Sequence, residues 1–391
     1  MIPNLRFSEF NNQWQRTKLG NVFASVNSGK SKKTDLGQYP LLGSTGVIGL
    51  TDDILPYETL IIVARVGANA GLVNLYRGKY GATDNSLVLI PNDDIDATFT
   101  SILLMQMNLM RYATGSGQPL VTGGLIKSLN GYFPSIREQN KIGLFISLLD
   151  QKINLLNKKK EALETYKKGL MQKIFSQELR FKREDETDYP EWQHYIMGQL
   201  FENISTNSLS RALLYENGDV LNLHYGDIHL KYSGLLDISK AELPFALKTD
   251  YKFKESSKME TGDVIFADAA EDYEGIGKAV EIRQTGATHS YAGLHTIHLK
   301  SKTEVLASGY MGYLSQTYAF RRKVWFIAQG AKVLGISSKE LLKLSVVVPK
   351  KEEQDKIVAV FSNLDAYLKK VSNSIQSTEL LKQGLLQQMF V

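Results

Sequence analysis

The stretch Pro134-Ser-Ile-Arg-Glu-Gln-Asn-Lys-Ile142 recurs as Pro349-Lys-Lys-Glu-Glu-Gln-Asp-Lys-Ile357, 215 residues further along the chain. The same shift aligns residues 134–175 with residues 349–390 without a gap, and 14 of the 42 aligned residues are identical. Internal similarity at a fixed shift indicates a duplicated structural element. We therefore expect two copies of one long segment.

Both copies place apolar residues at alternating intervals of three and four positions, which predicts one apolar face of an α-helix. Neither copy has a proline after its first residue, so each is expected to form an unbroken helix of about 38 residues, ~57 Å long. Such a stripe must be buried, either on the other helix or on helices of a partner. The predicted helix seam consists of Ile142, Ile146, Leu149, Ile153, Leu156, Leu163, Leu170, Ile174, Ile357, Phe361, Leu364, Leu368, Val371, Ile375, Leu385 and Met389.

A long mixed segment precedes each predicted helix. The two segments begin alike, with Leu5-Arg-Phe7 and Leu179-Arg-Phe181, each followed by a tryptophan and a Leu-Gly or Met-Gly step, but their middles differ. Apolar runs predict strands at 59–64, 86–90, 263–267, 294–299 and 344–348, and helices are expected at 101–110 and 306–319. The fold class is therefore α+β. The predicted ranges are 1–133 for the first globule, 134–183 for the first helix and linker, 184–348 for the second globule and 349–391 for the second helix.

The net charge of +5 is unevenly distributed over the 391 residues. Residues 134–183 carry 12 basic and 5 acidic side chains, which makes this segment attractive to a polyanion such as DNA, although a solvated helix face has the same composition. Residues 184–348 are net negative by five charges. The absence of cysteine excludes disulfides and thiolate metal sites and fits a reducing cytoplasm. Neither a secretory signal nor an apolar run long enough to span a membrane is visible.

Motifs for catalysis are absent from the sequence. It contains no Pro-Pro dipeptide, which excludes the Asn/Asp-Pro-Pro-Tyr/Phe motif of amino-methyltransferases, and no phosphate-binding Gly-x-x-x-x-Gly-Lys. His295 and His298 lie three apart in a predicted strand, on opposite faces, which favours ordinary polar positions over a metal site. We expect no metal and no cofactor in this chain, and we expect it to be non-catalytic.

These residues resemble the specificity subunit of a type I restriction-modification enzyme. The resemblance covers the organisation of the whole chain, and it is most specific at the two Pro-x-x-x-Glu-Gln-x-x-Ile openings that start at Pro134 and Pro349. Thr114-Gly-Ser-Gly-Gln118 resembles the turn before the last segment of a target recognition domain, and Gln329-Gly-Ala-Lys332 resembles it more weakly. The Leu-Ile-Ile after Tyr57-Glu58 departs from the Gly-Asp usual in the family.

The resemblance implies two target recognition domains, each reading half of a bipartite double-stranded DNA target. It implies that the two long helices pack antiparallel, with pseudo-twofold symmetry, and fix the spacer between the halves. Two modification (methyltransferase) subunits would dock on this frame and methylate adenine, and restriction subunits would cleave DNA in an ATP-dependent way. S-adenosylmethionine, ATP and Mg would then belong to partner subunits, and the location would be cytoplasmic.

Basic and polar side chains of the two globules are the candidate DNA contacts. Phosphates are contacted mainly by Lys and Arg, and base edges by residues that donate and accept in fixed geometry. The predicted DNA-binding residues are Lys30, Lys32, Lys33, Arg65, Asn69, Arg77, Lys79, Gln118, Tyr225, Lys252, Lys254, Lys258, Tyr291, Arg321, Arg322, Lys323 and Lys332.

A second interpretation is a bivalent protein-binding scaffold, in which two unlike globules on a coiled coil bind proteins and no nucleic acid. It accounts for the repeat and for the acidic second half, but less well for the paired Glu-Gln openings. A standalone enzyme is disfavoured by the missing motifs.

Overall fold

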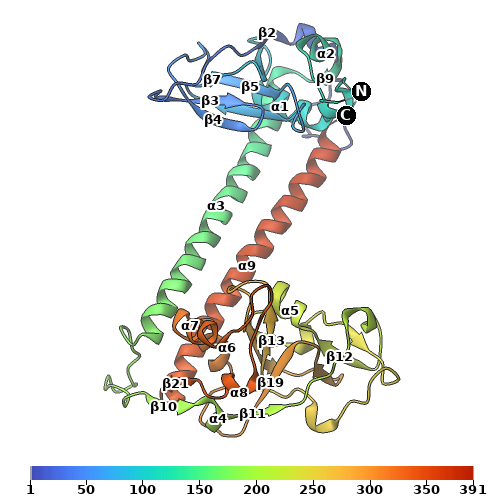
Figure 1. Ribbon diagram of the computed structural model, residues 1–391. Coiled ribbons are helices and arrows are strands. Elements are labelled where there is room, and N and C mark those ends of the chain that lie inside the picture. Colours follow the sequence, from blue (N-terminus) through green and yellow to red (C-terminus); the bar gives the residue numbers. More distant parts are fainter. Residues whose placement is uncertain (1, 116, 391) are drawn as a thin grey trace. The chain divides into compact units, whose positions relative to one another are not determined.

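The computed structural model describes residues 2–115 and 117–390, which divide into two compact units. Unit 1 contains residues 2–159 and 371–390, and unit 2 contains residues 160–370. The units cut across the predicted ranges because each takes a part of both long helices, α3 (Ile136–Phe175) and α9 (Lys351–Met389). Figure 1 labels the elements.

Unit 1 holds a four-stranded sheet in the order β2-β8-β5-β6 and a three-stranded sheet in the order β4-β3-β7. The strand β1 pairs antiparallel with β9, the strand that leads into α3. The bounds are β1 Gln15–Lys18, β2 Phe23–Ser28, β3 Tyr39–Gly43, β4 Gly46–Thr51, β5 Thr59–Ala64, β6 Val73–Arg77, β7 Gly81–Ala82, β8 Ser86–Pro91, α1 Ala97–Met107, α2 Gly123–Ser128 and β9 Asn130–Phe133.

Unit 2 holds a five-stranded sheet in the order β11-β19-β15-β17-β13 and a three-stranded sheet in the order β14-β12-β18. The strand β10 pairs with β21, the strand that leads into α9, as β1 pairs with β9 in unit 1. The bounds are β10 Gln193–Ile196, α4 Met197–Leu200, β11 Phe201–Ile204, β12 Val220–Leu223, α5 Tyr225–Leu230, β13 Gly234–Asp237, β14 Phe245–Ala246, β15 Val264–Ala267, β16 Ala269–Ala270, β17 Ala279–Gln284, β18 Ser290–Ala292, β19 Thr296–Ser301, α6 Tyr310–Leu314, α7 Tyr318–Ile327, β20 Leu334–Gly335, α8 Ser338–Leu341 and β21 Ser345–Val348.

The fold class is α+β, as predicted, with two long helices. Two predicted elements were wrong in detail. The single helix expected at 306–319 is two short helices, α6 and α7, separated by a turn at Ser315–Thr317. The strand expected to begin at Leu294 begins at Thr296, because His295 adopts a left-handed φ of 54° that ends the extended conformation.

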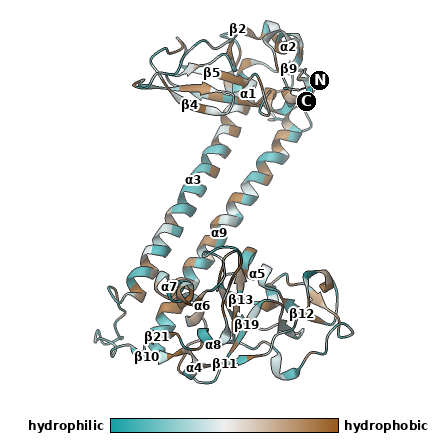
Figure 2. Cartoon of the chain, viewed as in Figure 1, coloured by the Kyte–Doolittle hydropathy of each residue, from teal (hydrophilic) through white to brown (hydrophobic). Residues whose placement is uncertain are grey.

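The parts of α3 and α9 within each unit run antiparallel. In unit 1, Lys382 donates to Asp150 at 2.5 Å, and the buried Ile142 and Met389 share one core. In unit 2, Lys167 donates to Asp365 at 2.5 Å. The two ion pairs correspond at the 215-residue shift, so each unit pairs its two helix segments through equivalent residues. Figure 2 shows hydrophobic and hydrophilic residues alternating along both helices.

All sixteen predicted seam residues are buried or half-buried. Leucines of α3 outside the predicted seam are exposed instead: Leu144, Leu148 and Leu155 have exposed fractions of 61%, 51% and 66%. The contrast follows from the helical period, because residues at intervals of three and four share one face and the residues between them face away.

The Glu-Gln pair of each helix opening is buried and fixes the start of the helix. The Gln139 amide donates to the Pro134 carbonyl and accepts from the Asp96 backbone N–H. The Gln354 amide donates to the Pro349 carbonyl and accepts from the Ala307 backbone N–H. Each glutamine therefore connects the start of its long helix to the segment just before a short helix of the same unit, α1 or α6.

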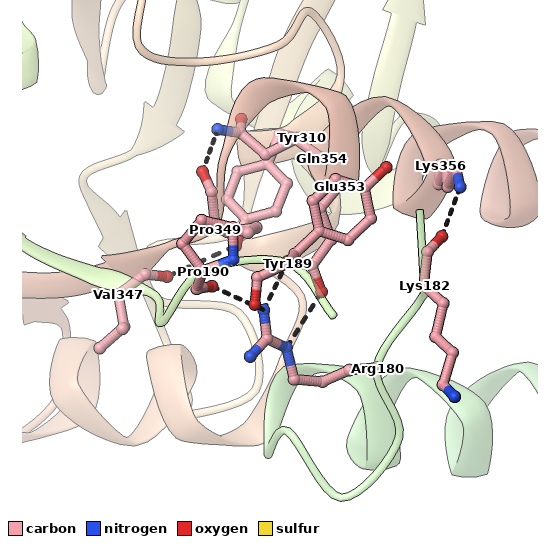
Figure 3. Close-up of polar contacts among 10 residues, drawn as sticks. All are labelled: Arg180, Lys182, Tyr189, Pro190, Tyr310, Val347, Pro349, Glu353, Gln354 and Lys356. Atoms are coloured by element: carbon pink, nitrogen blue, oxygen red, sulfur yellow. Dashed lines mark hydrogen bonds and ion pairs between the residues drawn. The ribbon is translucent and has the colours of Figure 1, made fainter. Parts of the chain in front are cut away.

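The glutamate of each opening forms a two-point ion pair with the arginine of a Leu-Arg-Phe tripeptide. In unit 1, Arg6 donates to both oxygens of Glu138 at 2.7 Å. In unit 2, Arg180 donates to both oxygens of Glu353 at 3.2 and 2.9 Å, and it also reaches the carbonyls of Tyr189 and Pro190 (Figure 3). The hydrogen bond to Glu353 raises the pKa of Arg180. The arginine of each tripeptide thus supplies the counter-charge of a buried carboxylate.

The carboxyl of Glu281 is buried in unit 2 and accepts hydrogen bonds from the backbone N–H groups of Gly309 and Gly312 at the start of α6. Burial raises the pKa of Glu281 from 4.5 to about 7. The folded protein therefore holds a proton that the unfolded chain releases above about pH 4.5. The resulting stabilisation is full below pH 4.5 and is lost as the pH rises through 7.

We expect the free energy of unfolding of the wild type to fall by about 3 kcal/mol more than that of Glu281→Gln between pH 4.5 and pH 8, since glutamine does not titrate. Urea unfolding of both proteins at several pH values measures the difference. If the free energies of unfolding of both proteins change with pH in parallel, folding does not raise the pKa of Glu281.

Candidate nucleic-acid interface

Two loops of unit 1 are joined by backbone hydrogen bonds at the end of β5. The first loop covers 65–71 and the second covers 114–121, in which Ser116 lies outside the described residues. Val121 donates its N–H to the Arg65 carbonyl at 2.8 Å, and Gly67 donates to the Pro119 carbonyl at 3.1 Å. Within the second loop Thr114 and Leu120 exchange both backbone hydrogen bonds. We call this arrangement the paired loops of unit 1.

Unit 2 contains an equivalent arrangement at the end of β15, formed by residues 268–278 and 329–336. Ile336 donates to the Asp268 carbonyl at 2.9 Å, and Gln329 and Gly335 exchange both backbone hydrogen bonds. The second loops of the two units correspond at the 215-residue shift. Ala64 and Ala267 also close their loops in the same way, because each accepts from a glycine N–H. We call this arrangement the paired loops of unit 2.

A glycine with positive φ follows the first residue of each second loop. Gly115 has a φ of 104° and Gly330 has a φ of 125°, which L side chains rarely adopt. A Cβ on Gly115 would lie 2.6 Å from the Gln118 carbonyl oxygen, and one on Gly330 would lie 2.0 Å from the Val333 carbonyl oxygen. These two positions therefore require glycine.

The same backbone frame carries opposite charges in the two units. Arg65 occupies the position that Asp268 occupies in unit 2. The backbone N–H of Arg65 donates to the carbonyl of Asn85, just before β8, and that of Asp268 donates to the carbonyl of His295, just before β19. Burial raises the pKa of Asp268, and the neighbouring His295 counteracts part of that effect. The paired loops of unit 1 thus present a cation where those of unit 2 present a carboxylate.

The structure brings four predicted DNA-binding residues of unit 1 to one end of its four-stranded sheet. Lys30 follows β2, Arg65 and Asn69 follow β5, and the Gln118 amide lies over Gly67. Strands β2 and β5 end at the same edge because both pair antiparallel with β8. By contrast, Arg77 and Lys79 lie at the other end of β5, since Arg77 pairs with Thr59, and Lys32 and Lys33 lie further along the loop after β2.

In unit 2, the structure separates the predicted residues into exposed and internal ones. Tyr225 borders a cleft beside the paired loops, and Lys332 is exposed on the second loop. Arg322 is exposed on α7, and Lys252, Lys254 and Lys258 lie together on the segment before β15.

Three of the predicted contacts of unit 2 serve the fold itself. Tyr291 is 4% exposed and packs on Phe253. Arg321 is 9% exposed and donates to the carbonyls of Tyr273 and Glu274, which holds the first loop of the pair. Lys323 donates to the Ser345 carbonyl. We leave these three out of the proposed DNA contacts.

The predicted DNA-binding residues do not include Asp268, His229 or His295, which lie at the paired loops of unit 2. His229 bonds the Ala269 carbonyl at 2.9 Å, and His295 bonds the Asp268 carboxylate at 3.2 Å. The signal that could have found them is the match between Ala64-Arg65 and Ala267-Asp268 at the ends of equivalent strands.

A further histidine, His298, has a structural role. His298 is buried and bonds the buried Asp263 at 2.7 Å inside the five-stranded sheet. Within residues 2–115 and 117–390, no group of three or more His, Asp or Glu side chains could hold a metal ion. Over the same ranges, no helix is long and apolar enough to cross a membrane.

Comparison with known proteins connects this architecture to one family. Residues 11–165 match the family described as type I restriction modification DNA specificity domain. The type I restriction enzyme MjaVIII specificity subunit of Methanocaldococcus jannaschii is 22% identical over 386 residues, which cover 90% of this chain and 86% of that protein. The EcoprrI specificity subunit of Escherichia coli is 28% identical over 159 residues, which cover 38% of this chain and 39% of that protein.

Solved structures share the fold. The type I restriction-modification S subunit from M. genitalium superposes with a TM-score of 0.65 at 16% identity, covering 100% of this chain and 99% of that one. A chain from a study of complex assembly and conformational transition of the type I restriction-modification system gives a TM-score of 0.56 at 14% identity, covering 98% of both chains.

Residues 11–165 thus match the DNA specificity domain of type I restriction-modification systems. Over its whole length the chain is similar to the specificity subunits of such systems.

Proposed function

We propose that each unit reads one half of a bipartite double-stranded DNA target through its paired loops. The observation that carries this proposal is the recurrence of one hydrogen-bonded loop frame in two globules that otherwise differ. Side chains on the frame differ in charge and shape, so the two units would select different base sequences, since base edges are distinguished by hydrogen-bond pattern.

Cations around the paired loops would supply the sequence-independent affinity. In unit 1 these are Lys30 and Arg65, and in unit 2 they are Lys332 and Arg322, all of which reach solvent at least in part. Contacts to phosphates set the register of a protein on the duplex and release counterions. The exposed Lys252 and Lys254 extend this set in unit 2.

We propose that α3 and α9 fix the spacer between the half-sites, because each helix contributes residues to both units. Two modification subunits would dock on the recognition domains and on the helices. The exposed Leu144, Leu148 and Leu155, spaced four and seven residues apart on α3, offer them an apolar face. Single exposed apolar residues are common on surfaces, but a stripe of them favours a partner.

The catalytic steps would belong to partner subunits. We propose that this chain binds no cofactor, that S-adenosylmethionine serves the modification subunits, and that ATP and Mg serve the restriction subunits. A modification subunit would flip its adenine out of the duplex to methylate it. The cytoplasm, where bacterial and archaeal DNA lies, is the proposed location.

Selection from randomised duplexes tests the proposal. The chain, co-purified with its modification subunits, is expected to enrich two short defined sequences separated by an undefined spacer of constant length. Enrichment of one continuous sequence, or of none, would overturn the proposal.

We expect Gly115→Ala to lower specific DNA binding about 10-fold or more without unfolding unit 1, because the added Cβ would displace the second loop against the Gln118 carbonyl. Gly117→Ala is the matched control, since a Cβ there meets nothing within 4 Å and Gly117 has no positive φ. Equilibrium binding of both variants to the selected duplex measures the difference. Equal affinities would remove the second loop from the interface.

A further inference from the structure

A cleft of about 1010 Å³ opens beside the paired loops of unit 2, between α5 and the first loop. Its walls include His224, Tyr225 and His229 from α5 and its N-cap, and His295 from the turn before β19. The rings of His229 and His295 both meet the Tyr225 ring edge to face, with centroid distances of 5.6 and 5.3 Å.

The partners of these imidazoles fix which ring nitrogen carries the proton. The Asp268 carboxylate can only accept, so His295 donates Nδ1–H to it, and in the neutral form of the ring Nε2 is then an acceptor. The Ala269 carbonyl likewise accepts from His229 Nε2–H. His224 Nδ1 accepts the Gly226 N–H, which leaves its proton on Nε2.

The backbone of His295 lies in the left-handed region. Its φ of 54° is uncommon for residues other than glycine, although histidine adopts it more often than most, and such conformations collect at functional sites. The Asp268 N–H donates to the His295 carbonyl at 3.1 Å, so Asp268 holds both the backbone and the ring of His295. The side chain of His295 is nevertheless 50% exposed.

Charged side chains of both signs border the cleft. Arg211, Lys231 and Lys278 border it; Arg211 is paired with the buried Asp227, which leaves Lys231 and Lys278 to meet phosphates. Glu271 and Asp272 also border it, and these carboxylates repel the keto oxygens of guanine and thymine. To a base in the cleft His295 therefore offers an acceptor, its Nε2, whereas the His224 Nε2–H offers a donor.

We propose that His295 is a specificity-determining residue of unit 2, whose Nε2 accepts a hydrogen bond from the exocyclic amino group of one adenine or cytosine in its DNA half-site. Asp268 is the positioning residue that fixes the ring. This inference rests on the proposed function and names the chemistry read by one of its two sites.

The experiment uses the chain in complex with its modification subunits. Selection from randomised duplexes first gives the bipartite target, and Arg65→Gln identifies the half read by unit 1. The same selection with His295→Gly then identifies the position in the other half at which the base preference is lost. Glycine suits this position because it accepts the left-handed φ, so the variant removes only the side chain. At that position the base is replaced by its analogue without the amino group, purine for adenine or 2-pyrimidinone for cytosine.

We expect the wild type to bind the analogue duplex roughly 5- to 100-fold more weakly than the natural one, and His295→Gly to bind the two equally. Asp268→Ala should lose the same discrimination, and because it removes a negative charge, its affinity for a scrambled duplex should not fall. Asp268→Asn should retain the discrimination, since its amide oxygen still accepts Nδ1–H. Glu304→Gln, an exposed charge outside the cleft, is the matched control.

The outcomes separate the two claims. A wild type that selects a bipartite target, with no position altered by His295→Gly, overturns the assignment of His295 and leaves the proposed function standing. An analogue penalty that persists in His295→Gly overturns it as well. A wild type that selects no bipartite target overturns the proposed function and this inference together. If His295→Gly does not fold, Asp268→Ala decides by the same criterion.

Discussion

Replacing Arg180 by alanine is expected to lower the free energy of unfolding of unit 2 by about 3 kcal/mol. Glu353 is 1% exposed at its side chain, and Arg180 donates to both of its oxygens. Without the arginine, a buried carboxylate would lose its counter-charge, and the carbonyls of Tyr189 and Pro190 would lose a donor. Chemical denaturation of the wild type and the variant measures the loss.

The matched control is Arg322→Ala, which removes an exposed arginine of the same unit and should cost less than about 0.5 kcal/mol. Combining Arg180→Ala with Glu353→Leu should recover part of the loss, since an apolar side chain needs no counter-charge. If Arg180→Ala and Arg322→Ala cost the same, the ion pair contributes nothing.

The equivalent change in unit 1, Arg6→Ala, is expected to cost less than Arg180→Ala. Glu138 also accepts from the Trp14 indole N–H at 3.3 Å, so it keeps one donor when Arg6 is lost. The comparison of two related sites in one chain therefore tests how much a second donor offsets the loss of a buried ion pair.

Insertion of one base pair between the half-sites is expected to weaken specific binding at least about 100-fold. Two readers on a shared frame bind as a bivalent ligand, and this advantage disappears when both cannot engage at once. One added base pair rotates one half-site by about 34° and moves it by about 3.4 Å relative to the other. Titration of labelled duplexes with the complex measures the change.

Replacement of the spacer bases at constant length is the control, and it should leave affinity unchanged. Unaltered binding after the insertion would contradict the proposal that the helices set the spacing. Equal weakening by the insertion and by the replacement would indicate instead that the spacer bases themselves are read.

The periodic parts of the fold could be predicted from the sequence because their information is local. Seam positions such as Ile142 and Phe361 follow from the helical period, and the predicted strand at 59–64 matches β5. The partners of Glu138 and Glu353 could not be predicted in this way. Each glutamate meets an arginine more than 130 residues away in the chain, and such a contact leaves no periodic trace.

Prediction of the candidate site was limited by the same cause. Gly115 and Gln118 were recognised through the Thr-Gly-Ser-Gly-Gln motif, but nothing in the sequence around His295 shows that its ring bonds Asp268, 27 residues upstream. Composition also gave no way to separate the buried Arg321 from the exposed Arg322, because adjacent residues on a helix point in different directions.

The shared loop frame has a consequence for engineering. Corresponding hydrogen bonds hold the paired loops of both units. The side chains of 65–71 and 114–121 can therefore be introduced at the equivalent positions of the loops of unit 2. Such a chimera would carry the same loop side chains in both units. The two halves of its DNA site should then resemble each other more closely than those of the wild type.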